Sequence, residues 1–177
     1  MTAWSSSLLS RVEKTLQDRP HWGNQNTSIG QVGKKEKSIH LAVFVEPFLQ
    51  FLLQGRKTVE SRFSIHRRAP FGCVNSGDLV LIKESGGPVV AIAEVSKVWY
   101  YQLDESAWDV IRSRFSQQLC VEDPEFWKSK ASSCFATLMQ FARIDKLEPV
   151  SCSKKDRRGW VVLGGPDRQP ELFSLGK

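Results

Sequence analysis

The chain has 177 residues, of which 41% are hydrophobic and 25% charged, and its net charge at neutral pH is +6. This length suffices for one hydrophobic core and is short for two, and the composition is that of an ordinary globular protein. No apolar run approaches the roughly 18 residues of a membrane-spanning helix, and the N-terminus lacks the pattern of a secretory signal. We therefore expect a cytoplasmic protein with no membrane partner.

The first 38 residues are predicted to form a short amphipathic helix and a flexible linker. Apolar residues recur at helical spacing within residues 4–17. Residues 20–38 are rich in Gly, Asn, Gln and Lys and show no periodicity, which is typical of a linker. We expect the N-terminal helix and linker to occupy residues 1–38 and one folded domain to occupy residues 39–177.

The domain is predicted to combine short strands with helices grouped in two places. Pro47 suits the first turn of a helix, and Gly55 is positioned to end it. Asp104 and the pair Asp123-Pro124 are typical of helix starts. The predicted strands cover residues 39–45, 57–63, 78–83, 89–101, 135–144 and 160–163, and the helices follow residues 47, 104 and 123. This order favours an α+β fold built on an antiparallel or mixed barrel with helical insertions.

The segment GRKTVESR, residues 55–62, places several polar side chains on a predicted strand. Alternate side chains of a strand face opposite sides, so Thr58, Glu60 and Arg62 are predicted to share one face, with Lys57 entering from the preceding turn. The guanidinium of Arg62 suits a phosphate or a base edge, and Glu60 suits an exocyclic amine or the orientation of Arg62. An ion pair between Glu60 and Arg62 without a ligand is the alternative.

Basic residues concentrate in two segments. Residues 56–68 contain five Lys or Arg and one acidic residue, and residues 154–158 contain four and one. We expect the two segments to meet at one edge of the barrel and form a phosphate-binding rim. Its predicted members are Arg67, Arg68, Lys155, Arg157 and Arg158. A basic loop beside a core tryptophan, Trp160, is the alternative for the second segment.

Three aromatic residues, Trp99, Tyr100 and Tyr101, follow one another at the end of a predicted strand. We expect Trp99 to pack in the core. The two tyrosines must face opposite ways, so one of them is a candidate to stack on a base.

Several motifs together resemble the ASCH domain family of the PUA-like superfamily. The resemblance rests on helix-initial Pro47, then GRKTVESR, then Gly77-Asp78 before an apolar strand, and on residues 154–163, KKDRRGWVVL, which are similar to the family's final strand. It covers roughly residues 39–163. It implies a PUA-like mixed or antiparallel β-barrel with flanking helices, to which this chain adds an N-terminal helical extension.

The same resemblance implies a cleft beside the GxKTxExR strand and roles in RNA binding or RNA-linked metabolism. Carried over by position, the cleft residues are Lys57, Thr58, Glu60 and Arg62, with Asp78 in the following turn. The implied partner is RNA or another single-stranded nucleic acid, or a nucleotide-like small ligand. A basic cleft that binds RNA is our first hypothesis.

A small hydrolase acting on a modified nucleoside or on RNA is the alternative, with Lys57 and Glu60 as the reactive pair. Some relatives are amidohydrolases that use a lysine of this motif and a threonine two or three positions further on. Here Glu60 stands three positions after the lysine and Thr58 follows it directly, which departs from that pattern. A ribonuclease-like reaction and a protein-interaction adaptor are further hypotheses.

The sequence predicts no metal site and no cofactor. It has three histidines and four scattered cysteines without a CxxC pair, and it contains no phosphate-binding GxxxxGK[ST], GxGxxG, HExxH or GxSxG motif. We expect the cysteines to be reduced and mostly buried.

Overall fold

The computed structural model describes residues 2–19, 21–22, 37–155 and 157–165. In chain order the elements are α1 (Ala3–Leu16), β1 (Ile39–Phe44), α3 (Phe48–Leu53), β2 (Val59–Ser64), β3 (Leu79–Glu84), β4 (Val89–Gln102), α4 (Glu105–Leu119), α5 (Pro124–Lys130), β5 (Phe135–Val150) and β6 (Trp160–Gly164).

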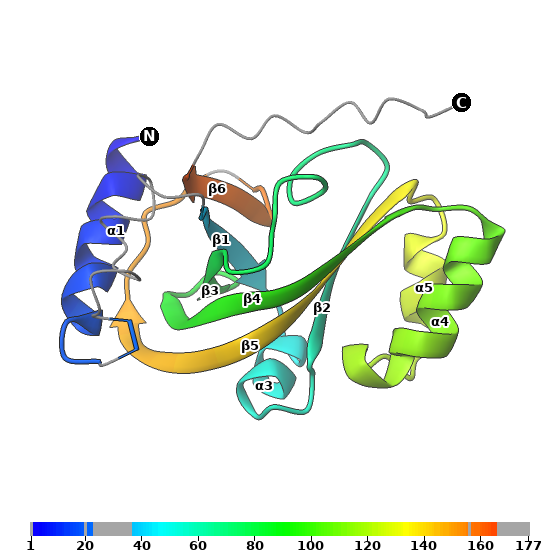
Figure 1. The fold of residues 1–177 in the computed structure, drawn as a ribbon, viewed down its shortest axis with the longest axis horizontal. Coiled ribbons are helices and arrows are strands. Elements are labelled where there is room, and N and C mark those ends of the chain that lie inside the picture. The colour runs from blue at the N-terminus through cyan, green and yellow to red at the C-terminus, as the bar shows by residue number, and fades with distance from the viewer. Residues whose placement is uncertain (1, 20, 23–36, 156, 166–177) are drawn as a thin grey trace.

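One six-stranded sheet, with the order β2-β5-β4-β3-β1-β6, organises the molecule. β1 and β3 pair in parallel, and the other four pairings are antiparallel. The long strands β4 and β5 bend strongly, so the sheet curls into a half-barrel (Figure 1). β2 and β6 are the two ends of the strand order. The predicted mixed barrel is confirmed in this form.

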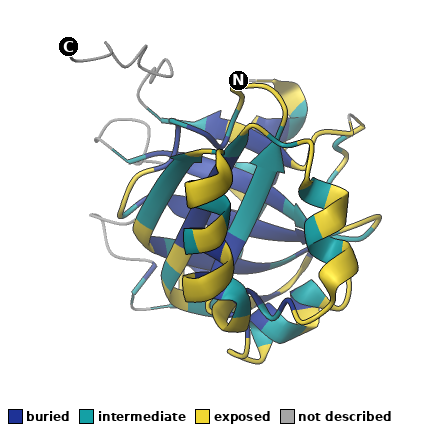
Figure 2. Cartoon of the chain, turned by 90° about the vertical axis from the view of Figure 1, so that its right-hand side faces the viewer, coloured by how far each residue is buried: buried dark blue, intermediate teal, exposed yellow. Residues whose placement is uncertain are grey.

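Helices cover the sheet at several places. α1 lies at one end of the molecule, α4 and α5 lie at the opposite end, and α3 packs beside the curl (Figure 1). Figure 2 shows the outward faces of the helices exposed and the strands behind them largely buried. Within the described residues, no helix is long and apolar enough to cross a membrane.

Two hydrophobic clusters lie on the sheet away from α1. The first fills the curl and includes Leu49 and Leu52 of α3. The second joins β2 to α4 through the helical residues Ile111, Phe115 and Leu119. These three residues recur at i, i+4 and i+8, the spacing of one helical face, which is why α4 buries a stripe against the strand.

The described part of the N-terminal segment packs on the remaining face of the sheet. Leu8, Val12 and Leu16 of α1 share one hydrophobic cluster with Trp22 and residues of the strands. The indole N–H of Trp22 donates to the carboxylate of Asp145 on β5. Residues 23–36 of the predicted linker lie outside the described residues, and the division into segments 1–38 and 39–177 stays a prediction.

Most predicted elements are confirmed to within a few residues, with two corrections. β5 continues to Val150 instead of ending at residue 144, because Leu147 and Val150 pack in the cluster under α1 while pairing with β4 extends the strand. Pro47 is the N-cap of α3, and the helix begins at Phe48.

The predicted helix starts at the acidic N-caps are confirmed. A carboxylate oxygen of Asp104 accepts from the backbone N–H of Ala107 at 2.8 Å, and Asp123 accepts from that of Glu125 at the same distance. Each contact satisfies an N–H that the first helical turn leaves without a helical partner.

The four cysteines are all free thiols. Cys73 is buried and burial raises the pKa of its thiol. Cys120 and Cys152 are half-buried and Cys134 is exposed, so the prediction of mostly buried thiols holds only in part.

Candidate nucleic-acid interface

Three charged side chains of the GRKTVESR segment form a buried row. The carboxylate of Glu60 lies 3.3 Å from Lys57 Nζ through Oε2 and 2.8 Å from Arg62 Nε through Oε1. The side chains of Lys57 and Glu60 are 3% and 8% exposed and that of Arg62 is 20% exposed. Charges at this depth require opposite charges and hydrogen bonds to offset their lost hydration, and Glu60 stands between two cations.

The guanidinium of Arg62 links β2 to the strands at the other end of the sheet. Its Nη2 donates to the carbonyl of Val43 at 2.9 Å and its Nη1 to that of Gly159 at 3.2 Å. Its Cζ atom lies over the rings of Phe44 and Trp160, 5.0 and 5.6 Å from their centroids. Two of the five guanidinium N–H groups thus donate to protein carbonyls, and Arg62 also borders the hollows described below.

Lys57 and Thr58 occupy different environments. Lys57 Nζ donates to the carbonyl of Leu119 at 3.3 Å and lies 5.5 Å from the ring centroid of Phe48. Thr58 precedes β2, and its side chain is exposed and borders a separate hollow beside α3 and β5. The structure therefore places Glu60 and Arg62 together with Lys57 and leaves Thr58 apart, which corrects the predicted three-residue face.

Two adjoining hollows lie along β2. The first, with a volume of about 700 Å³, is bordered by residues 62–64, 68–70 and 157–162 and by Thr137. The second, of about 330 Å³, includes Lys57 and Glu60 in its lining. The two hollows share Arg62 and Phe63. They therefore adjoin along β2, and we call the two together the β2 groove; Arg62 borders both parts, and Lys57 and Glu60 border the second.

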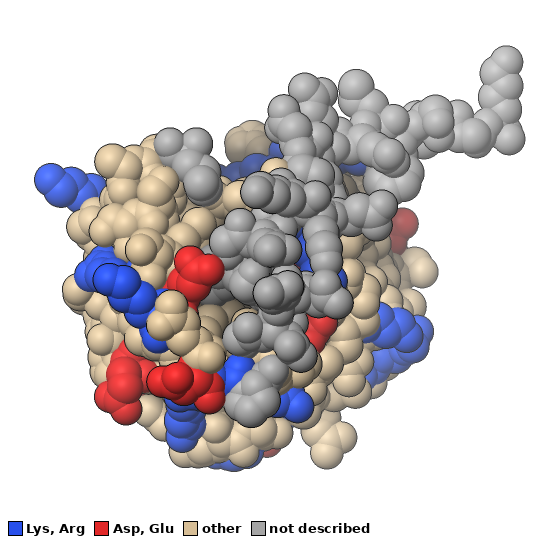
Figure 3. All heavy atoms as spheres, turned by 60° about the vertical axis from the view of Figure 1, so that its left-hand side comes forward, with Lys and Arg blue, Asp and Glu red and all other residues tan. Residues whose placement is uncertain are grey.

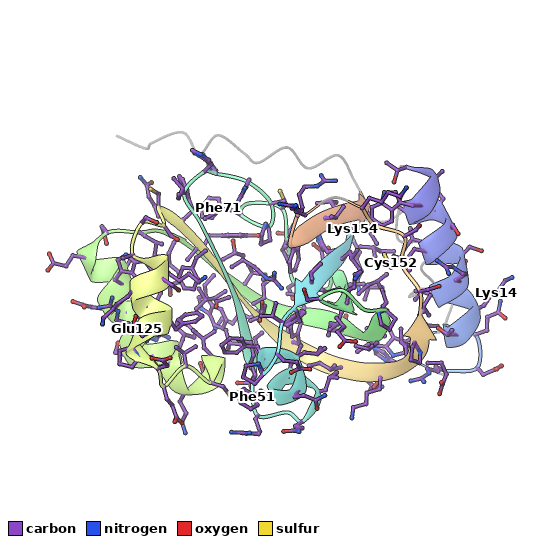
Figure 4. The ribbon with its side chains drawn as sticks, turned by 180° about the vertical axis from the view of Figure 1, so that it is seen from behind. Lys14, Phe51, Phe71, Glu125, Cys152 and Lys154 are labelled. Carbon is purple, nitrogen blue, oxygen red and sulfur yellow. The ribbon has the colours of Figure 1, made fainter. Side chains whose placement is uncertain are left out.

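Residues of the two predicted basic segments meet at the first hollow. Arg68 from the loop after β2 and Arg157 and Arg158 from the segment before β6 all border it. Arg67 is exposed and lies over the ring of Phe71 at 5.5 Å. Lys155 is exposed and does not border the hollow. Figure 4 shows the loop that bears Phe71 and the segment that bears Lys154 along the same edge of the molecule.

On the side of the molecule that carries α1, acidic and basic side chains are interspersed. Figure 3 shows blue and red atoms side by side over the parts of this face drawn in colour. The convergence of arginines at the first hollow thus differs from the mixed charge of that face.

A buried polar chain supports the floor of the first hollow. The indole N–H of Trp160 donates to His40 Nδ1 at 3.2 Å, and His40 Nε2 lies 3.2 Å from Asp78 Oδ2. Because an indole N–H only donates, Nδ1 must accept, so Nε2 carries the hydrogen and donates it in a hydrogen bond to Asp78. Asp78 also accepts from the backbone N–H groups of Ser38 and Asn75, both at 2.7 Å.

The chemistry of Asp78 follows from these contacts. Burial by itself raises the pKa of Asp78, but the hydrogen bonds from His40 and from the backbone N–H groups of Ser38 and Asn75 outweigh it, so the pKa is lowered. The sequence pattern places Asp78 in a turn and indicates no role for His40. A histidine within the apolar run IHLAVF was the signal for a buried polar contact.

The tyrosines proposed for base stacking are both engaged in packing. The hydroxyl of Tyr100 exchanges hydrogen bonds with the backbone of Val74, and its ring contacts Phe71. Tyr101 packs against the cluster beneath α4. In the part of the chain that the structure describes, no group of three or more His, Cys, Asp or Glu residues is placed to hold a metal ion.

Comparisons with known proteins support the fold. No family model and no curated protein matches the sequence. The crystal structure of ASCH from Zymomonas mobilis matches with a TM-score of 0.52 and 15% identity, covering 64% of this chain and 73% of that chain. Two mutants of the same protein match with TM-scores of 0.50 and 0.51 and identities of 14% and 15%. They cover 65% and 66% of this chain and 76% and 75% of theirs.

The half-barrel with flanking helices is therefore an ASCH-like fold. At this level of identity the likeness concerns the arrangement of the elements.

Proposed function

We propose that the protein binds RNA or another single-stranded nucleic acid in the β2 groove. The observation that carries this proposal is the convergence of Arg68, Arg157 and Arg158, from two separate segments, around one hollow. Phosphate groups are the ligands that such a set of guanidinium groups suits. The ASCH-like fold supports the same proposal, since the family resemblance implies a nucleic-acid partner.

The groove offers apolar surface as well as charge. Phe63, Pro70 and Trp160 border the first hollow next to the arginines. A single strand exposes its bases as well as its phosphates, so a groove with both kinds of surface suits it. In this proposal Arg68, Arg157 and Arg158 contact phosphates, with Arg67 and Lys155 further along the rim. Lys57, Glu60 and Arg62 form the base of the groove, and a direct role for them or for Thr58 in nucleotide recognition stays a prediction.

The salt dependence of RNA binding tests the proposal. Each phosphate neutralised by the protein contributes about −0.7 to the slope of log affinity against log salt for a single strand. The double variant Arg68→Ala/Arg157→Ala should therefore bind more weakly and have a slope smaller by about 1.4, measured by fluorescence anisotropy with labelled single-stranded RNA.

The matched control is Lys14→Ala/Arg114→Ala, which removes two exposed cations from α1 and α4. This control should keep the affinity and slope of the wild type. Equal effects of the two double variants, or no binding by the wild type, would contradict the proposal.

The alternative, a hydrolase acting on a modified nucleoside or RNA, has one specific observation in its favour. Lys57 Nζ and Glu60 Oε2 lie 3.3 Å apart, and both residues border the second hollow. Proton transfer requires such proximity between the two groups. Product formation that is lost in Lys57→Ala while RNA affinity is retained would assign this reaction to the pair.

A further inference from the structure

The first hollow lies between two strand edges. It is bordered by the consecutive residues Arg62, Phe63 and Ser64 of β2 and by residues 159–162 at β6. Successive side chains of a strand point to opposite faces. Because residues from both faces of each strand border the hollow, it lies at the edges of these strands, where main-chain groups are near. β2 and β6 also end the strand order, so the hollow occupies the place between the two edges of the curled sheet.

The register of β6 identifies the main-chain groups that face the hollow. Ala42 pairs with Trp160 and His40 with Val162, and the N–H of Val43 donates to the carbonyl of Gly159 at 2.9 Å. In an antiparallel pair, residues that exchange hydrogen bonds alternate with residues that do not. Because Val43 and Gly159 are a hydrogen-bonded pair, Trp160 and Val162 direct their N–H and C=O groups away from β1.

The short edge favours a base over a peptide. β6 has five residues, and a peptide added as a strand would pair in register with only Trp160 and Val162. A nucleobase needs a shorter length of strand edge than a peptide, because its own edge presents a donor and an acceptor close together. Arg68 and Arg157 border the same hollow and supply charge for the adjoining phosphate. Val162 is 44% exposed, which leaves apolar surface open beside these main-chain groups.

We propose that the outward N–H and C=O groups of Trp160 and Val162 on β6 bind the edge of a nucleobase. This assignment rests on the proposed nucleic-acid function. It adds to that function the groups that distinguish one base from another. The arginines hold the strand through its phosphates, which every nucleotide shares. The main-chain groups of β6 have fixed positions, so they favour the base whose donor and acceptor match them.

Proline at position 162 tests the role of the main chain. Val162→Pro removes the outward N–H, and edge strands accept proline where its N–H does not belong to the ladder. Affinity for the preferred homopolymer among short RNAs of A, C and U should fall about tenfold, as expected for an unmade hydrogen bond, and the preference should weaken. Val162→Ala keeps the N–H and should keep the preference. Equal loss in both variants would overturn the proposal, because the side chain would then be responsible.

Amide hydrogen exchange of the wild-type chain gives a second measurement that does not depend on the proline variant folding. Saturation with the preferred RNA should slow exchange at the N–H of Val162 and Trp160. Unchanged exchange at both, with RNA bound, would overturn this assignment and leave the proposed function standing. An acidic peptide that protects these N–H groups where RNA does not would also overturn it. A wild-type chain that binds no RNA would overturn both.

Discussion

At the scale of single residues, the most informative feature is the row formed by Lys57, Glu60 and Arg62. From the sequence alone, these three charged side chains within six residues are expected to bind a ligand. In the fold Glu60 pairs with both cations, and Arg62 additionally donates to two carbonyl groups across the open side of the half-barrel. The row is therefore a structural support for the groove, whatever the groove binds.

Replacing Glu60 tests this support. Glu60→Gln leaves Lys57 and Arg62 without their anion, and removing one partner of a buried ion pair costs about 3–5 kcal/mol. The free energy of unfolding, measured with urea, should fall by an amount of that order.

Glu125→Gln is the matched control, because Glu125 pairs with Lys128 on the surface with both side chains about 70% exposed. The free energy of unfolding of Glu125→Gln should stay within about 1 kcal/mol of the wild-type value. A variant at Glu60 as stable as this control would contradict the structural role of the row.

At the scale of elements, the contacts of Asp78 join the starts of the parallel strands β1 and β3. Its carboxylate accepts from the N–H of Ser38, directly before β1, and from that of Asn75, in the loop before β3. Through His40 the same carboxylate is connected to Trp160 of β6. One buried acid thus orders three strands beneath the first hollow.

The lowered pKa of Asp78 predicts a pH dependence of stability. Because the folded-state pKa lies below the unfolded value of about 3.9, the ionised carboxylate stabilises the fold above that value. This contribution is lost as the pH falls through the folded-state pKa. Urea unfolding at a series of pH values between about 5 and 2 should show the loss in the wild type and less of it in Asp78→Asn. Parallel curves for the two proteins would show that Asp78 does not supply this dependence.

At the scale of the whole molecule, α1 and Trp22 share a hydrophobic cluster with the sheet. Leu8, Val12 and Leu16 of α1 are at most 3% exposed, which is as buried as the strand residues in the same cluster. This packing predicts that the described N-terminal residues unfold together with the half-barrel.

Trp22→Ala tests that packing. Trp22 is 2% exposed, and replacing a buried tryptophan with alanine costs about 3–5 kcal/mol. Thermal unfolding should shift to lower temperature as one transition, followed by circular dichroism. Lys14→Ala, an exposed change on α1, should leave the transition in place. A Trp22→Ala curve that coincides with the wild type would show that the N-terminal packing adds nothing to the stability of the sheet.

The sequence by itself determined the order and kind of most elements. Period-two and helical spacing of apolar residues reflect burial of one face, and Asp104 and Asp123 act within one turn of their own helices. These signals depend only on residues near one another in the sequence, so they can be recognised before the fold is known. The predicted strand at residues 135–144 ends too early because the second half of β5 carries charged residues. Pairing with β4, which the sequence does not reveal, makes that half a strand.

Only the tertiary structure decided which polar groups from distant parts of the sequence meet. Arg62 and Gly159 are 97 positions apart and touch because the sheet curls until its two edges approach. The same curl brings Arg68 near Arg157 and directs the guanidinium of Arg62 toward protein carbonyls. Strand alternation predicts the face that a side chain occupies, whereas the curvature of the sheet determines whether that face is open or filled.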